Sequence, residues 1–312
     1  MPKQAALKRS ASSKPKKRKA PKHRSFRLSQ RISVKSVMGP WQITKQTLRT
    51  VKNNKKLFGG IVVLLTISNL LIVQAYGSFT NLTEIKEGIE AILGDQSSRI
   101  GVSWALFGSL VSSGMGQSSE TAGIYQSILV TIFSLAIIWA LRQVLAQEKI
   151  AFKDIFYKGM YPLIPFILVL FVIGLQLLPA VVGSFIYTTI FTDGLAVTAL
   201  EQVLWVLFCL LLYVFSAYMI LSSIFAVYIV TLPDMTPMKA LRSARSIVFG
   251  RRFKIAVRIV YLAIILCLLS LAILMPVIFL ATGAAQYVVY LLLAIILVFS
   301  HSYMYILYRE LL

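Results

Sequence analysis

The chain has 312 residues, of which 58% are hydrophobic and only 14% charged, and its mean hydropathy is +0.79. A soluble domain averages roughly 45–50% apolar and about 25% charged residues, so this composition excludes an ordinary soluble globular protein. The formal net charge of +21 is unevenly spread, because residues 1–56 hold 18 Lys and Arg and no acidic residue. Several apolar runs exceed the roughly 18 residues that cross a bilayer, which indicates a polytopic membrane protein.

Residues 1–36 are rich in Lys, Arg, Ser and Pro and have almost nothing to bury, so they are predicted to form a disordered polybasic tail. A tail of this kind binds polyanions with strong salt dependence. Anionic membrane lipid is its expected partner, and nucleic acid is expected only through weak polyanion binding. The next stretch, 41–56, places Trp41, Ile43 and Leu48 among basic residues, which predicts a helix lying on the membrane surface.

Residues 37–312 are predicted to form one all-α membrane domain, because six apolar segments are long enough to cross a bilayer. The predicted transmembrane helices cover residues 57–78, 124–146, 161–189, 200–231, 255–280 and 285–308. Both cysteines, Cys209 and Cys267, lie inside apolar segments. We interpret them as small hydrophobic residues and not as a disulfide pair.

The charges between the spans predict the orientation of the chain, since Lys and Arg collect in the cytoplasmic connections of membrane proteins. The basic tail, the connection that carries Lys149, Lys153 and Lys158, and the segment 232–254 all fall on one side of the six spans. The connection 190–201, on the other side, has two acids and no base. We therefore expect a multi-pass protein of the cell membrane with cytoplasmic N- and C-termini.

The connection after the first span, 79–123, differs from the others in its length and in its apolar content. Its segment 100–111, IGVSWALFGSLV, is apolar or small throughout. About a dozen such residues are too few to cross a bilayer. We expect this connection to form an interfacial or re-entrant cap on the outer face.

A weak internal repeat organises the spans. VFSAYMIL at 214–221 resembles VFSHSYMYIL at 298–307, and the spans before these two hold Pro179 and Pro276. The repeat predicts three helical hairpins, each preceded by a basic interfacial helix. The predicted units cover roughly 41–146, 147–231 and 232–312. The alternative is chance recurrence of Leu, Val, Phe and Tyr in an apolar chain.

The segment 232–254, LPDMTPMKALRSARSIVFGRRFK, carries six basic residues and one acid between two apolar spans. Thr236 is placed to cap a helix that begins at Pro237, and Gly250 suits the position after its end. We expect the apolar face of this helix to lie at the headgroup boundary, and docking on the protein's own bundle is the alternative. The side chains expected to bind anionic lipid headgroups are Lys239, Arg242, Arg245, Arg251 and Arg252.

The same segment carries a resemblance to a known family. An aliphatic residue and proline that end a span, then Ala-Leu-Arg, a serine and a Gly-Arg pair, resemble part of the membrane domain found in some glycerophosphodiester phosphodiesterases and in related bacterial multi-spanning proteins. The matching residues are Pro233, Ala240, Leu241, Arg242, Ser246, Gly250 and Arg251. The resemblance implies a membrane module over about 41–312. It implies no phosphodiesterase activity, because in those enzymes the chemistry belongs to a separate soluble barrel domain with no counterpart in this sequence.

The sequence offers few groups for catalysis. It has no CxxC or HExxH spacing, no glycine-rich phosphate loop and only two histidines, His23 and His301. Charged residues are nearly missing from the span interiors, which argues against an ion-coupled pump. We therefore expect no metal, no cofactor and no enzymatic activity.

Polar side chains nevertheless gather in the inner halves of two spans that the repeat relates. They form a candidate polar pocket lined by Ser216, Tyr218, Ser222, Ser300, His301 and Tyr303. Hydrogen bonding between helices and an aromatic belt are the alternative explanation, and the one that we favour.

Three functions are compatible with these features. The favoured hypothesis is a non-catalytic integral membrane module that organises anionic lipids or partner proteins at the cytoplasmic face, because basic surface helices are present and coupling residues are not. The second is a permease or exporter of a small neutral or amphipathic compound, which would use the polar pocket. The third is a membrane-embedded lipid enzyme that depends on His301.

Overall fold

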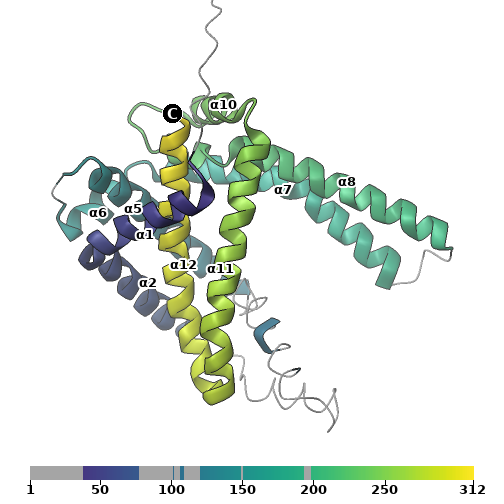
Figure 1. Ribbon diagram of the computed structural model, residues 1–312, viewed down its shortest axis with the longest axis horizontal. Helices are drawn as coiled ribbons and strands as arrows, with labels where there is room; N and C mark the ends of the chain where they lie inside the picture. Colours follow the sequence, from purple (N-terminus) through teal and green to yellow (C-terminus); the bar gives the residue numbers. More distant parts are fainter. Residues whose placement is uncertain (1–37, 77–100, 102–105, 109–119, 149, 193–197) are drawn as a thin grey trace, which may run out of the picture. The chain divides into compact units, whose positions relative to one another are not determined.

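The computed structural model describes residues 38–76, 101, 106–108, 120–148, 150–192 and 198–312. Within this part of the chain all regular structure is helical (Figure 1). The helices are α1 (Pro40–Asn53), α2 (Lys55–Tyr76), α5 (Glu120–Leu145), α6 (Phe152–Gly159), α7 (Leu163–Thr192), α8 (Ala199–Ser223), α9 (Ala226–Ile229), α10 (Pro237–Val248), α11 (Arg252–Leu280) and α12 (Thr282–Leu311). The predicted disordered tail, 1–36, and most of the predicted cap, 79–123, lie outside the described residues.

Among the described residues, five helical segments are long and apolar enough to cross a membrane, which is consistent with a multi-pass membrane protein. These candidate spans are Gly123–Leu145, Leu163–Phe191, Ala199–Ile229, Arg252–Leu280 and Tyr287–Leu311. They agree within a few residues with five of the six predicted segments. The remaining prediction, 57–78, falls on α2, which meets the same criterion over its described residues only when joined to α1, from which it is bent by 88°.

Local sequence explains how α8 begins, and a short interruption marks where it ends. The Thr198 hydroxyl accepts a hydrogen bond from the Glu201 amide, and the Glu201 carboxylate accepts one from the Thr198 amide, both at 3.3 Å. This reciprocal pair is a capping box. The predicted span 200–231 is interrupted at Ile224 and Phe225, so its last turn is a separate helix, α9.

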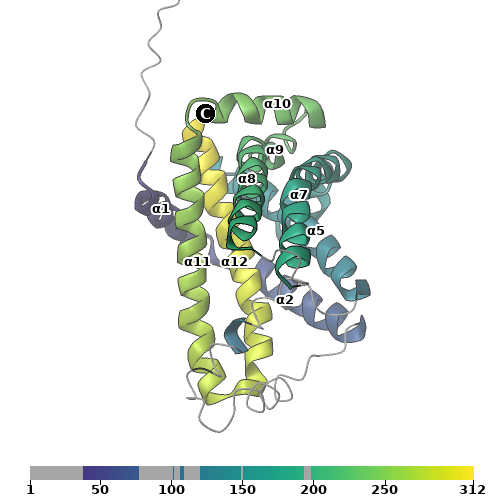
Figure 2. The same cartoon turned by 90° about the vertical axis from the view of Figure 1, so that its right-hand side faces the viewer.

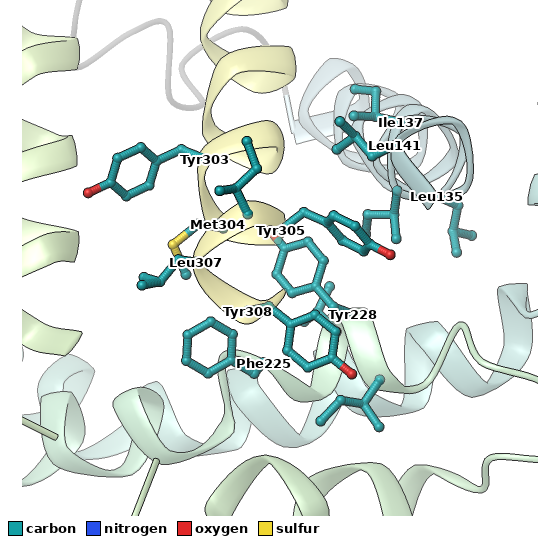
Figure 3. Close-up of a cluster of buried hydrophobic side chains, with 14 of the residues drawn as sticks. Leu135, Ile137, Leu141, Phe225, Tyr228, Tyr303, Met304, Tyr305, Leu307 and Tyr308 are labelled. Atoms are coloured by element: carbon teal, nitrogen blue, oxygen red, sulfur yellow. The ribbon is translucent and has the colours of Figure 1, made fainter. Parts of the chain in front are cut away.

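The packed core is built around α12. This helix contacts α1, α2, α5 and α11, and its aromatic side chains meet those of the α8–α9 region (Figure 3). The Tyr228 ring packs on Tyr305 and Tyr308, with ring centroids 6.0 and 6.3 Å apart. Phe225 stacks on Tyr308 at 6.2 Å. Because buried aromatic rings contribute large contact areas in preferred geometries, this cluster fixes the end of the α8–α9 span against α12.

α7 and α8 pack on each other along their length (Figures 1 and 2). An added Cβ at Gly183 would lie 3.4 Å from the Cβ of Leu212, so the two helices are in van der Waals contact there. Pro179 lies inside α7 and has no backbone N–H to donate. Close to it, the Gln176 carbonyl accepts a hydrogen bond of 2.8 Å from the Ser216 hydroxyl of α8. This hydrogen bond therefore links α8 to the backbone of α7 one turn before the proline.

A second, smaller core lies at the turn between α11 and α12. Leu274 and Ile278 of α11 and Leu292 of α12 are buried there. Leu106 and Phe107, two of the few described residues of the predicted cap, pack in the same cluster. These two residues of the connection between α2 and α5 therefore contact the end of the α11–α12 hairpin.

Candidate functional site

The predicted basic helix is present as α10, and its three central bases face outward. Lys239, Arg242 and Arg245 are exposed, whereas Ala240 and Ala244 are fully buried. Spacings of three and four residues explain this division, because they return to the same face of a helix with about 3.6 residues per turn. Figure 2 shows α10 lying across the ends of its neighbours, and it contacts α7, α8 and α9.

The apolar face of α10 packs on the protein's own bundle, which was the alternative prediction for this face. Ala240, Ala244 and Val248 belong to the same buried cluster as the residues of α9 and α12. The small alanine side chains permit this close docking. Thr236 precedes the helix as predicted, but its hydroxyl makes no capping hydrogen bond. Gly250 follows the helix end with a φ of +76°, a backbone conformation that favours glycine.

The two arginines that follow α10 differ from its three exposed bases. Arg251 and Arg252 are partly buried. The Arg252 guanidinium lies over the Tyr218 ring, 4.2 Å from its centroid, in a cation–π contact. Among the five predicted headgroup ligands, the three on α10 are therefore turned outward, whereas Arg252 is held by an aromatic ring of α8.

α1 shows the same division between a docked face and an outward face. Ile43 and Thr47 are buried, and α1 contacts α12 and α11. Trp41 and Leu48 are 66% and 60% exposed, and Lys45 is exposed with them. Positions 41, 45 and 48 follow the spacing of one helix face. A basic and apolar stripe therefore faces away from the bundle.

α6 is shorter and follows the same pattern. Its Gly159 is buried, and an added Cβ there would lie 3.3 Å from the backbone of Ala136 in α5. Lys153 and Lys158 are exposed, and Tyr157 is 83% exposed. Each of the three short helices thus presents bases together with large apolar or aromatic side chains, and each directly precedes a long helix.

Of the six predicted pocket residues, Ser300 alone lines one of the two cavities between helices of the described part of the chain. On α8, the Ser216 hydroxyl bonds to the backbone of α7. The Ser222 hydroxyl bonds within its own helix, to the Met219 carbonyl at 2.6 Å. Tyr218 is half exposed and lies under the Arg252 guanidinium. These three side chains therefore serve contacts between or within helices.

The residues that α12 contributes have separate partners. The Ser300 hydroxyl donates to the Leu297 carbonyl at 3.0 Å. Tyr303 is fully buried, and its hydroxyl donates to the Arg258 carbonyl of α11 at 3.3 Å. Hydrogen bonding between helices and aromatic packing, the favoured alternative explanation, describes these contacts better than a pocket does.

His301 is the centre of a hydrogen-bonded chain across three helices. Its Nδ1 lies 3.1 Å from the Tyr228 hydroxyl of α9, and its Nε2 lies 2.9 Å from the Ser134 hydroxyl of α5. A serine beside a histidine that a third group orients is also the arrangement of an activated nucleophile. Neither Ser134 nor His301 lines either of the cavities described below. The geometry therefore supports a structural link. Among the described residues, His, Cys, Asp and Glu form no group of three that could hold a metal ion.

Two cavities between helices contain polar groups. The first, of about 930 Å³, lies between α5, α6, the start of α7 and residues 230–236, and its polar lining includes Arg142, Lys158, Thr231 and Asp234. The second, of about 510 Å³, lies between α2, α5 and α12, and its polar lining includes Asn69, Gln126, Ser127 and Ser300. Asn69 is buried, and its Oδ1 has no hydrogen-bond partner among the described residues.

Arg258 was not predicted as a functional residue, although its side chain is buried and charged. Its guanidinium donates to the Met38 carbonyl through Nε at 3.2 Å and through Nη2 at 2.9 Å. Nη1 donates to the Lys254 carbonyl at 2.7 Å. A charge inside a predicted span was the available signal. Asn69 and Ser134 were missed as well, and each is a polar residue within an otherwise apolar segment.

No family model matches the chain, and no curated protein or solved structure matches it in comparisons of sequence and fold.

Proposed function

We propose that this chain is a non-catalytic integral membrane module that organises anionic lipids, or a partner protein, at the cytoplasmic face of the cell membrane. The proposal adds α2 to the five candidate spans, so that six spans place both termini on the cytoplasmic side. It groups the helices into three units, each a short basic helix followed by a hairpin. The segment Pro233–Arg251, with its resemblance to the membrane domain of some glycerophosphodiester phosphodiesterases, lies in the third unit.

The observation that carries the proposal is the composition of the exposed faces of α1, α6 and α10. Beside their bases lie Trp41, Leu48, Tyr157 and Met238, which are 66%, 60%, 83% and 72% exposed. At the headgroup level of a bilayer, such side chains reach the acyl boundary while the bases meet lipid phosphates. The 88° bend between α1 and α2 supports this placement, because a helix perpendicular to a span lies in the membrane surface.

A triple substitution on α10, Lys239→Gln with Arg242→Gln and Arg245→Gln, tests this function. Each base near an anionic membrane surface contributes about 1 kcal/mol, so the variant loses about 3 kcal/mol of attraction. The protein would be isolated in native membrane discs, and the retained lipids and proteins would be identified by mass spectrometry. We expect the variant to retain a lower ratio of anionic to zwitterionic lipid than the wild type.

The matched control keeps the charges of α10 by Lys239→Arg, Arg242→Lys and Arg245→Lys, and it should retain lipid as the wild type does. A stoichiometric protein that is held by the wild type and control, but not by the glutamine variant, would support the partner form of the proposal. Equal anionic-lipid ratios in all three proteins, with no partner lost, would contradict it.

One observation favours a second candidate function, a permease or exporter of a small neutral or amphipathic compound. The cavity of about 510 Å³ is lined by Asn69 and Ser300 together with apolar side chains. A compound with a hydrogen-bond donor and an apolar body would suit this lining. The candidate predicts saturable flux across liposomes that Asn69→Leu abolishes and Tyr218→Phe leaves unchanged. A lack of flux for a panel of uncharged amphiphiles would count against it.

A further inference from the structure

The cavity of about 930 Å³ contains a charged side chain at a depth suited to lipid headgroups. Arg142 lines this cavity and lies in the last turn of α5. The candidate span that contains it ends three residues later, at Leu145. Basic side chains near the ends of membrane spans lie at the headgroup level of the bilayer. The guanidinium is therefore within reach of lipid phosphates and of soluble anions.

Hydrogen bonds hold the Arg142 guanidinium in place, but not all of its donors have an acceptor among the described residues. Its Nη2 donates to the Thr231 carbonyl at 2.7 Å and also to the Thr231 hydroxyl. That hydroxyl donates in turn to the Tyr228 carbonyl at 2.8 Å. The Arg142 Nε is buried and has no hydrogen-bond partner among the described residues. Nε is enclosed by protein atoms, so an anion in the cavity would meet the accessible end of the guanidinium, and phosphate oxygens match the forked geometry of arginine well.

The charges around the cavity limit the kind of anion that fits. Arg142 and Lys158 line it with positive charges, and Asp234 lines it with one negative charge. Lys158 already pairs with Asp154, outside the lining, at 3.0 Å, so Arg142 is the lining base that has no carboxylate partner among the described residues. A group with one negative charge, such as a phosphodiester, matches this single guanidinium better than a polyphosphate does.

The rest of the lining is suited to an amphiphile. Leu135, Trp139 and Pro165 line the cavity. Tyr157 and Tyr161 line it too, and they are 83% and 93% exposed. Aromatic side chains in such positions pack beside the glycerol and upper acyl carbons of membrane lipids. A free phosphate ion would leave these surfaces uncovered, whereas a phospholipid would cover them.

We propose that this cavity holds the phosphodiester headgroup of a single phospholipid, with Arg142 donating to a phosphate oxygen and Lys158 beside it. The inference rests on the proposed function, because it requires this end of the bundle to lie at a membrane surface. It concerns one lipid in a defined cavity, which is distinct from the lipids that α10 attracts.

Native mass spectrometry of the full chain in a mild detergent, titrated with phosphatidylglycerol, tests the proposal by counting bound lipids and measuring their affinity. We expect the wild type to bind one phosphatidylglycerol molecule tightly. Arg142→Gln should weaken that binding about tenfold or more, because it removes a fixed charged donor. Lys158→Gln should weaken it less. Arg245→Gln, on the exposed face of α10, is the matched control and should bind as the wild type does.

Asp234→Asn is a second variant that keeps the test decisive if Arg142→Gln does not fold. Asp234 has a φ of +58°, which asparagine tolerates. The change removes the carboxylate charge from the lining of the cavity, so it should strengthen the binding of the anionic phosphatidylglycerol. Unchanged affinity in Asp234→Asn, or in a folded Arg142→Gln protein, would overturn the proposal.

Two further arms identify the source of the phosphate and separate this inference from the proposed function. Displacement of the lipid by inorganic phosphate at equal concentration would overturn the proposal, because it would identify a soluble anion as the ligand. If the triple glutamine variant of α10 keeps its anionic-lipid ratio while Arg142→Gln loses its bound lipid, the proposed function fails and the cavity site stands. If the triple glutamine variant instead loses anionic lipid while Arg142→Gln keeps its bound lipid, only the cavity site is contradicted.

Discussion

The Arg258 side chain joins segments that lie 220 residues apart in the sequence. Its guanidinium donates to the Met38 carbonyl, directly before α1, and to the Lys254 carbonyl in its own helix. The Tyr303 hydroxyl of α12 donates to the Arg258 carbonyl. Burial of a guanidinium is unfavourable unless its donors are used, and here these donors hold the start of α1 against α11.

Arg258→Gln should therefore loosen α1. Hydrogen bonds that involve a charged group contribute about 1.5–3 kcal/mol each, and the change removes those to the Met38 carbonyl. We expect a lower melting temperature in detergent and faster trypsin cleavage at Lys45 and Arg49, within α1. Arg245→Gln, an exposed change of the same type, is the control. Equal cleavage rates in the two variants would show that Arg258 does not hold α1.

The roles of single polar residues were difficult to predict from the sequence because a hydrogen-bond partner depends on which helices adjoin. The repeat placed Ser216 and His301 in the inner halves of two related spans. Ser216 bonds to α7, whereas His301 bonds to α5 and α9. The outward faces of α10 and α1 were predictable, since helical spacing alone separates their bases from their buried residues.

At the scale of elements, hydropathy predicted the long helices well, because long uncharged apolar segments are the strongest sequence signal for a span. The surface helix 41–56 was predicted separately from the first span, and α1 and α2 are indeed two helices with a bend of 88°. The division between α8 and α9 was not predicted. It lies between Ser223 and Ala226, where neither glycine nor proline marks a break, and aromatic packing on α12 accompanies it.

The docking of α6 on α5 gives a prediction at the scale of elements. Gly159→Ala adds a Cβ that would lie 3.3 Å from the Ala136 backbone, so α6 must move outward. Gly174→Ala in α7 meets nothing within 4 Å, and replacing glycine in a helix interior contributes roughly 0.5–1 kcal/mol. In thermal unfolding, we expect a higher melting temperature for Gly174→Ala, and an unchanged or lower one for Gly159→Ala. An equal rise in both variants would contradict the close packing of α6.

In the whole molecule, the charge asymmetry of the sequence corresponds to the exposed basic faces of three short helices. Charge between spans predicted that the tail, α6 and α10 share one side of the membrane. The structure adds that α1, α6 and α10 each dock one face on the long helices and expose bases on the other. The sixth span and the orientation are parts of the proposal, because they depend on α2 crossing the membrane.

Site-directed cysteine labelling tests this arrangement most directly. Starting from a Cys209→Ala and Cys267→Ala background, single cysteines would replace Lys45 in α1, Lys153 in α6 and Phe249 after α10, all of which are exposed. An impermeant maleimide would then be added to sealed vesicles of each orientation. If α1, α6 and α10 share one side of the membrane, all three positions are labelled only from the cytoplasmic face. Labelling of any one of them from the opposite face would contradict a shared lipid-binding surface and the six-span arrangement.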